Sequence, residues 1–317
     1  MFEAIDLEIQ RLPKSSAQRL TWRRGIRLLL VALMVFVLLS YAGLPLYMAV
    51  YWTHIPRVPV MGYVPSDAGF VYEDVRLTAS DGVELAGWYI PSQNGAAVIV
   101  LHGASGTRLW AKDHAEMLAR HGYGVLMLDA RGHGESGGRS LPHGWSGERD
   151  LSAALDYLYT RHDIDNGCIG ALGLSSGAMM ALRGAASLDG IQVVIADGAG
   201  FSAPDDVAAL PQPNRMLSLP VWWLALYETA LFSGESMPEP LIKLVPEIAP
   251  RPVLFIASSE SLIEREANRS YADALGASAE LWRVDAGHIS AFGVYPAEYE
   301  SRVIEFLDEV LLVGNEL

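Results

Sequence analysis

The sequence predicts an α/β fold with a mostly parallel central sheet flanked by helices, and a transmembrane helix at its N-terminal end. Two observations predict the sheet: short unbroken apolar runs recur along the chain, and helical stretches separate them. The third observation is residues 28–52, a segment of 25 residues without a charge, where about 20 apolar residues suffice to cross a bilayer as a helix. A chain of 317 residues, 51% of them apolar, is long enough for one globular domain with an appendage.

A basic segment, residues 1–27, precedes the apolar helix. Its six basic and three acidic side chains give this segment a net charge of +3. Since the whole chain has a net charge of −14, the remaining residues carry −14 − 3 = −17. The positive-inside rule then places the N-terminus in the cytoplasm, and the domain beyond the linker at residues 53–69 outside it. A cleaved signal peptide is the alternative, since Ser40-Tyr41-Ala42 resembles a cleavage site. The apolar run continues for ten residues past Ala42, which favours a single-pass membrane anchor.

Composition limits the partners and cofactors of the domain. The acidic charge argues against binding of nucleic acid. The single cysteine, Cys168, excludes an intrachain disulfide framework and a cysteine-rich zinc site, and the eight histidines show no metal-binding spacing such as HExxH. We therefore expect no metal and no cofactor.

Residues 70–317 hold the predicted sheet. Phe70–Thr78 and Val83–Ile90 alternate apolar and polar residues around Ser80-Asp81-Gly82, which predicts a β-hairpin. Further strands are predicted at Ala96–Leu101, Gly124–Leu128, Cys168–Leu172, Val193–Ala196, Val253–Ala257 and Glu280–Val284. Helices are predicted at Leu109–His121, Gly147–Arg161, Ser176–Ala186 and Ala297–Leu312. Because strand and helix alternate, parallel strands with right-handed crossovers are expected.

A Pro-rich insertion at about residues 201–249 interrupts this alternation. It contains the apolar cluster Val221–Leu226, which needs a surface to pack against. A helix packed flat on the domain is one interpretation. A lid over an active site is the interpretation we favour, because long insertions in compact domains are often functional. Trp222 and Trp223 are assigned to this lid and to the substrate pocket.

Gly173-Leu174-Ser175-Ser176-Gly177 is the strongest catalytic motif. It matches G-x-S-x-G directly after a predicted strand and before a predicted helix, where a sharp turn exposes the serine hydroxyl above the sheet. A Gly-rich turn, His102–Gly106, follows another strand and lets a backbone N–H approach a substrate oxygen. The amides of Ala104 and Ser176 are the predicted oxyanion hole, while His102 is expected to brace this loop.

A serine hydroxyl needs a base, and His288 is the best placed histidine, since it follows the last predicted strand. The remaining histidines lie in predicted linkers, helices or loops and are expected to be solvated: His54, His114, His121, His133, His143 and His162.

With these motifs, residues 70–312 resemble the α/β-hydrolase superfamily. Asp129–Ser136 resembles the D-x-R-G-x-G-x-S loop of its serine aminopeptidase and monoacylglycerol-lipase-like branch. The resemblance implies hydrolysis of esters, thioesters or amides without a cofactor. Together with the apolar helix and the tryptophans of the insertion, it indicates an apolar acyl substrate near the bilayer, with an ester cleaved through a triad of serine, histidine and acid.

The sequence departs from this family at the acid. The family places an aspartate soon after the strand predicted at Val253–Ala257, and here Ser261 occupies that position. Glu260 is the first candidate for the acid, because glutamate serves in some triads of this fold. Asp197, after the preceding strand, is the second candidate, and Glu264 is the third.

Two other functional classes remain as alternatives. Gly132–Gly137 matches the GxGxxG dinucleotide fingerprint, but Pro142 follows closely and the motif does not lie in the first strand-helix-strand unit. A binding domain without catalysis is the more serious alternative, because a fold does not determine a function. Cleavage of amides or peptides by the same residues is the third possibility.

Overall fold

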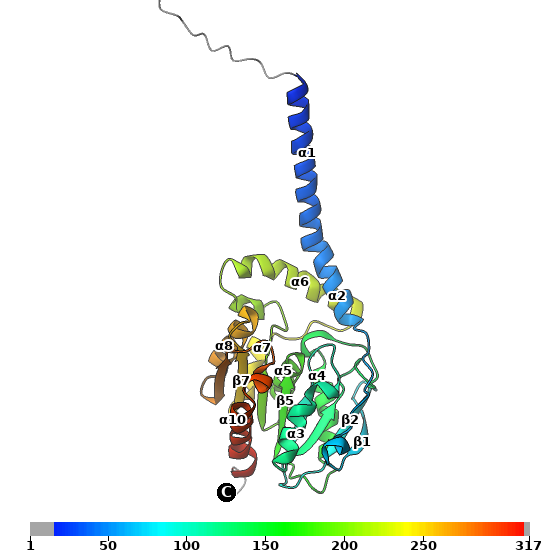
Figure 1. Ribbon diagram of the computed structural model, residues 1–317, viewed down its shortest axis with the longest axis vertical. Coiled ribbons are helices and arrows are strands. Elements are labelled where there is room, and N and C mark those ends of the chain that lie inside the picture. Colours follow the sequence, from blue (N-terminus) through cyan, green and yellow to red (C-terminus); the bar gives the residue numbers. More distant parts are fainter. Residues whose placement is uncertain (1–15, 314–317) are drawn as a thin grey trace, which may run out of the picture.

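A computed structural model describes residues 16–313, with side chains described from Trp22 onward, and it contains an eight-stranded sheet below a long N-terminal helix (Figure 1). The strands are β1 (Glu73–Thr78), β2 (Glu84–Ile90), β3 (Ala97–Leu101), β4 (Gly124–Leu128), β5 (Ile169–Leu174), β6 (Val193–Asp197), β7 (Val253–Ser258) and β8 (Ala279–Val284). Their order is β1-β2-β4-β3-β5-β6-β7-β8. Only the β1–β2 and β2–β4 pairs are antiparallel, so the predicted hairpin and the mostly parallel sheet are confirmed.

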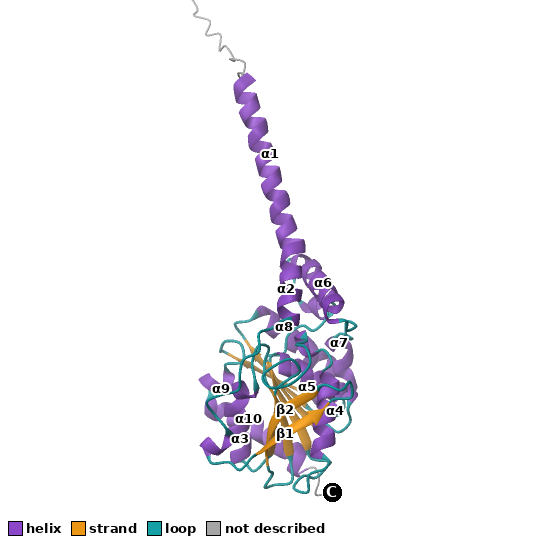
Figure 2. Cartoon of the chain, turned by 90° about the vertical axis from the view of Figure 1, so that its right-hand side faces the viewer, coloured by secondary structure: helices purple, strands orange, loops and turns teal. Residues whose placement is uncertain are grey.

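Helices cover both faces of the sheet (Figure 2). One face packs against α4 (Gly147–Leu158), α5 (Ser176–Ser187) and α8 (Leu262–Leu275), and the other against α3 (Lys112–Arg120) and α10 (Pro296–Asp308). Successive residues of a strand point to opposite faces, so Ile99 and Val100 of β3 belong to different apolar cores. This double burial explains why the central strands are apolar at every position.

Helix α8 is the main element that the sequence analysis missed. It begins after Ser261, whose Oγ accepts a hydrogen bond from the backbone N–H of Glu264 at 3.3 Å. Such a bond satisfies one of the free N–H groups of the first turn. The residues after β7, to which the sequence analysis assigned no element, are therefore the start of a 14-residue helix.

The insertion after β6 is built around α6 (Asn214–Ser233), followed by the short helix α7 (Leu241–Leu244). Helix α6 lies at the end of the domain that faces the N-terminal helix (Figure 1). It packs on the apolar core through partly buried residues such as Trp222 and Leu219.

The N-terminal helix consists of α1 (Ser16–Leu38), a π-helical turn (Leu39–Gly43) and α2 (Leu44–Thr53), which continue one another. Its segment Trp22–Thr53 has 32 residues, a mean hydropathy of 2.4 over its most apolar window, and only 6% of that window buried. Within residues 16–313, this is the one helix long and apolar enough to cross a membrane. The first 15 residues of the basic segment lie outside the described part of the chain.

Candidate active site

Ser175 lies on a sharp turn between β5 and α5. Its backbone has φ 55° and ψ −112°, a sparsely populated conformation that persists only where the surrounding structure enforces it. A Cβ at Gly177 would lie 2.4 Å from the carbonyl oxygen of Leu101, so only glycine lets the start of α5 approach the end of β3. The turn thus holds Ser175 at the carboxyl edge of the sheet, in the context that its motif predicts.

Ser175, His288 and Glu264 form a continuous chain of hydrogen bonds. His288 Nε2 lies 2.9 Å from Ser175 Oγ, and His288 Nδ1 lies 2.6 Å from Glu264 Oε2. The other carboxylate oxygen of Glu264 accepts the backbone N–H of Ser258 at 2.6 Å. Glu264 is only 3% exposed, and its hydrogen bond raises the pKa of His288 against the opposing effect of burial. The arrangement provides a hydroxyl, a base beside it, and a buried carboxylate that orients the base.

The first-ranked acid, Glu260, does not make this contact. Its backbone N–H donates to Ser258 Oγ, and its carboxylate lies beside Gly287, where an added Cβ would be 3.8 Å from Oε2. Across the described residues, its carboxylate has no hydrogen bond to His288. The reason is α8: Glu264 lies in its first turn, where side chains tilt back toward the N-terminus and the end of β7, whereas Glu260 precedes the helix.

Asp197, the second candidate, lies behind the site in a different hydrogen bond. Its Oδ2 accepts the hydroxyl of Tyr299 at 3.1 Å, and its backbone carbonyl accepts the N–H of Ser175 at 2.8 Å. A Cβ at the next residue, Gly198, would be 3.0 Å from His288 Cε1, so this segment runs directly against the imidazole. Burial raises the pKa of Asp197 to about 7.

The loop after β3 reaches the serine from the other side. A Cβ at Gly103, the residue before Ala104, would lie 3.3 Å from Ser175 Cβ and 4.0 Å from Ser175 Oγ. Ser176 is the first residue of α5, where backbone N–H groups have no partner within the helix. His102 is buried and its Nε2 accepts the N–H of Ala130 at 3.0 Å, so it braces the loop as predicted.

A cavity of about 270 Å3 opens beside Ser175 and His288. Met179, Phe201 and Trp222 supply its apolar wall. The assignment of Trp222 to the pocket agrees with this position, whereas Trp223 does not line the cavity. Consecutive residues on a helix point about 100° apart, so Trp223 points away from the cavity that Trp222 lines. Trp223 is half exposed and stacks on Tyr227, with ring centroids 5.4 Å apart.

His143 is a wall residue that the sequence analysis missed. Its ring packs between Trp52 and Trp222, with centroid distances of 4.6 and 5.4 Å, and burial lowers its pKa to about 4. His143 is partly buried, and His114 and His133 are buried, so the expectation of solvated side chains is wrong for all three. The prediction failed because each is covered by elements distant in the sequence.

The N-terminal helix contributes directly to this region. Trp52, at the end of α2, stacks on Trp222 at a centroid distance of 5.7 Å. The neighbouring Tyr51 Oη lies 3.1 Å from Oγ of Ser105, which belongs to the loop that carries Ala104. Residues expected to belong to the membrane anchor therefore touch both the pocket wall and the predicted oxyanion loop.

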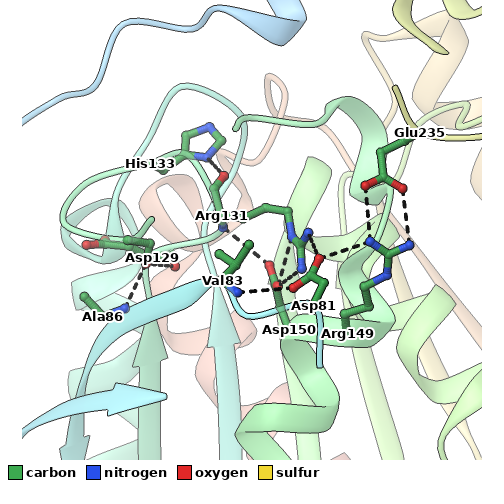
Figure 3. Close-up of polar contacts among 10 residues, drawn as sticks. Asp81, Val83, Ala86, Asp129, Arg131, His133, Arg149, Asp150 and Glu235 are labelled. Carbon is green, nitrogen blue, oxygen red and sulfur yellow. Dashed lines mark hydrogen bonds and ion pairs between the residues drawn. The ribbon is translucent and has the colours of Figure 1, made fainter. Parts of the chain in front are cut away.

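The Asp129–Ser136 loop is held by ion pairs and by its own hydrogen bonds (Figure 3). The Asp129 carboxylate accepts from Arg108 and from the N–H of Glu135, and a Cβ at Gly134 would lie 2.2 Å from Asp129 Oδ2. Among the glycines of the GxGxxG match, Gly134 thus lets the loop fold back on Asp129. No α-helix begins at them: across the described residues the next one is α4, at Gly147. This is not the strand-turn-helix context of a dinucleotide site.

A second set of charges ties this loop to the insertion (Figure 3). Arg131 pairs with Asp150 at 2.6 Å and with Asp81 at 2.7 Å. Arg149 bridges Asp81 and Glu235, which follows α6. The hairpin turn, the motif loop and the end of the insertion are therefore joined in one network.

Comparison with known proteins supports the fold and the class of the protein. A family model described as serine aminopeptidase, S33, matches residues 92–242. The esterase Pf2001 of Pyrococcus furiosus is similar in structure, with a TM-score of 0.68, 30% identity, and coverage of 82% of this chain and 98% of the esterase. These similarities define the protein as a hydrolase. The chain belongs to the α/β-hydrolase superfamily.

Several curated relatives that are similar in sequence are described only as uncharacterised proteins. YfhR of Escherichia coli K12 is 26% identical over 280 residues, which cover 82% of this chain and 91% of YfhR. A protein of Mycobacterium tuberculosis H37Rv is 35% identical over 129 residues, but this match spans only 45% of that protein. The relatives therefore extend the family across bacteria without naming a substrate.

Proposed function

We propose that the protein is a serine hydrolase that cleaves an ester of an apolar acyl group through an acyl-enzyme intermediate. The observation that carries this proposal is the hydrogen-bonded chain from Ser175 through His288 to Glu264, with distances of 2.9 and 2.6 Å. Serine is a weak nucleophile until an adjacent base accepts its proton, and the base in turn needs an orienting group. All three groups are in contact here, which disfavours a binding domain that has lost catalysis.

The reaction has two acyl-transfer steps. Ser175 Oγ attacks the ester carbonyl carbon as His288 Nε2 takes the hydroxyl proton, and Glu264 stabilises the resulting imidazolium through Nδ1–H. The amides of Ala104 and Ser176 stabilise the tetrahedral oxyanion. The intermediate collapses as the bond to the leaving alkoxide breaks, and His288 gives the alkoxide its proton. Water then attacks the acyl-enzyme in the same way, which releases the acid and restores Ser175.

The cavity supports an apolar acyl group. Its wall beside Ser175 includes Met179, Phe201 and Trp222, and no charged side chain other than Glu264 lines it among the described residues. Similarity to an esterase favours an ester as the substrate. The description of the matching family model favours an amide as the second candidate.

We further propose that residues 28–52 anchor the protein in a membrane with the N-terminus in the cytoplasm. The length and hydropathy of Trp22–Thr53 support a single crossing, and the basic residues before it support this orientation. The helix continues through Ala42, the last residue of the possible cleavage site, and its end packs against Trp222. These contacts favour retention of the helix over cleavage as a signal peptide.

Labelling with a fluorophosphonate probe tests the catalytic proposal. The wild-type chain should be labelled, and Ser175→Ala should not. Ser176→Ala is the matched control, because it removes the adjacent hydroxyl but keeps the backbone amide assigned to the oxyanion hole, so its labelling should persist. A folded wild-type chain that takes no label would favour the binding domain without catalysis. Paired p-nitrophenyl esters and p-nitroanilides of the same acyl groups then separate esterase from amidase activity.

A further inference from the structure

The outer face of α6 is an apolar stripe exposed to solvent. Its members recur at spacings of three and four residues and are Met216, Pro220, Trp223, Tyr227 and Leu231. At about 100° per residue they fall within roughly 80° of the helix surface. The opposite face, which includes Ala225 and Leu226, is buried against the domain. Helix α6 is therefore apolar on the face that packs and also on the face that does not.

A helix that is apolar all round is normally covered on all sides. Only two residues of α6 carry charge, Arg215 and Glu228, and their charges cancel. Met216 and Leu231, at the two ends of the stripe, are each 64% exposed. Contiguous apolar surface of this kind marks a contact with another protein or with a membrane.

The N-terminal helix favours a membrane over a protein. The 32 residues of Trp22–Thr53 span about 48 Å, whereas the hydrocarbon core of a bilayer is about 30 Å thick. About 12 residues are therefore in excess. Trp22–Arg27 hold three arginines, so the crossing of about 20 residues begins near Leu28 and ends near Tyr47, just beyond the π-helical turn and inside α2. Helix α6 packs against these same two elements. It also runs across the direction of α1 rather than along it (Figure 1).

We propose that α6 is an interfacial helix, whose stripe of Met216, Pro220, Trp223, Tyr227 and Leu231 inserts into the headgroup and upper acyl region of the membrane that α1 crosses. This inference rests on the proposed anchor. The contacts of α2 with α6 fix the stripe at the depth where the anchor leaves the hydrocarbon core. Trp and Tyr are the side chains enriched at that depth, and Trp223 and Tyr227 stack on one another within the stripe.

The chemistry of the stripe also defines what kind of membrane contact it makes. The domain is acidic and the stripe has no charge, so attraction to anionic lipids does not contribute. Insertion of α6 should therefore occur in vesicles of phosphatidylcholine alone and should not weaken in high salt. Trp222, next to the stripe on α6, lines the catalytic cavity, so this contact places the cavity wall at the membrane surface.

Fluorescence quenching in reconstituted phosphatidylcholine vesicles tests the proposal with the full chain. An environment-sensitive fluorophore is attached to Leu231→Cys, and in separate proteins to Met216→Cys, Phe36→Cys and Asp189→Cys. Phe36, 65% exposed on α1, reports the anchor, while Asp189 is an exposed residue beyond the far end of α5. The wild-type chain, whose Cys168 is buried, gives the labelling background, and thermal unfolding checks that each variant folds.

Lipids with a spin label near the headgroup should quench the α6 positions, whereas lipids labelled deep in the acyl chain should quench Phe36→Cys. Aqueous iodide should quench only Asp189→Cys. If Phe36→Cys is quenched by deep lipid labels but both α6 positions behave like Asp189→Cys, the interfacial helix is wrong and the anchor stands. Shielding of α6 from iodide without quenching by lipid would indicate a protein partner and overturn the proposal. Loss of lipid quenching at Phe36→Cys would overturn the anchor and the inference together.

Discussion

Replacing Glu264 by glutamine is the sharpest test of the acid in the proposed triad. The Glu264 carboxylate accepts two hydrogen bonds, from Ser258 N–H and from His288 Nδ1–H, and it is only 3% exposed. An amide has one acceptor oxygen and cannot accept both. If its oxygen keeps Ser258, its NH2 donates to Nδ1 and leaves the proton on Nε2, so that His288 cannot accept the proton of Ser175.

The structure allows the magnitude of this effect to be worked out. Rotating the amide to restore the productive tautomer points NH2 at the N–H of Ser258, which costs about 1–3 kcal/mol for the unsatisfied buried donors. Loss of the ionic hydrogen bond to the imidazolium costs about another 1.5–3 kcal/mol. Together, about 2.5–6 kcal/mol lowers kcat/KM on the order of 10²–10⁴-fold.

Hydrolysis of p-nitrophenyl butyrate by the full chain in detergent measures this loss. Glu260→Gln is the matched control, since Glu260 lies four residues away, carries the same side chain and does not touch His288. It should retain activity within a few-fold. The reasoning is refuted if Glu264→Gln keeps kcat/KM within tenfold of wild type, or if Glu260→Gln shows the larger loss.

Three further predictions follow from the same contacts. Glu264 raises the pKa of His288, and the neutral imidazole is the base, so kcat/KM of the wild type should fall as the pH drops through this raised pKa. In Glu264→Gln, the residual activity should fall at a lower pH than in the wild type. A pH profile that does not move in the variant would contradict the assignment of Glu264. Asp197 has a folded pKa of about 7 against an ordinary value of 3.8, so the folded state binds an extra proton between these pH values. This proton stabilises the fold most below pH 3.8, by on the order of 4 kcal/mol, and the stabilisation is lost as the pH rises to 7. In thermal unfolding, the wild type should lose on the order of 3 kcal/mol of it between pH 5 and pH 8, and Asp197→Asn should not. Trp52→Ala removes an aromatic contact with Trp222 that is worth about 0.5–1.5 kcal/mol, so KM for long-chain esters should rise roughly 2- to 12-fold. Trp22→Ala, on the exposed part of α1, is the control and should leave this KM unchanged.

Most of the sheet and the turn that carries Ser175, the proposed nucleophile, could be predicted because local patterns determine them. Each central strand is apolar on both faces, and such runs are interrupted by recognisable helices and turns. The turn at Ser175 is similarly local, since it needs a strand before it, a helix after it and small residues around it. His288 follows the last strand and could be located from chain order alone.

Glu264, the carboxylate that bonds His288, was only the third candidate for the acid, although a sequence signal for it exists. Ser261-Leu262-Ile263-Glu264 is an S-x-x-E pattern, typical of a helix that begins at the serine. A helix starting there places Glu264 in the first turn, where its side chain reaches back toward the end of β7. Ranking the acids by distance along the chain favoured Glu260, whereas the geometry of a helix start favours the residue three positions after the cap.

The contacts of His143, Tyr51 and Trp52 had no comparable signal, because they arise only when the end of α2 packs against α6. Sequence patterns separate an anchor, a linker at 53–69 and a domain from residue 70, yet the cavity is backed by residues from the first of these. Trp52 stacks on Trp222 and packs against His143, and Tyr51 bonds Ser105 beside the predicted oxyanion residue. The site is therefore not complete in residues 70–317 alone. A chain that begins at residue 54 would keep the triad but lose the support behind its pocket wall and its oxyanion loop, so the functional unit includes the end of the helix that we propose as the anchor.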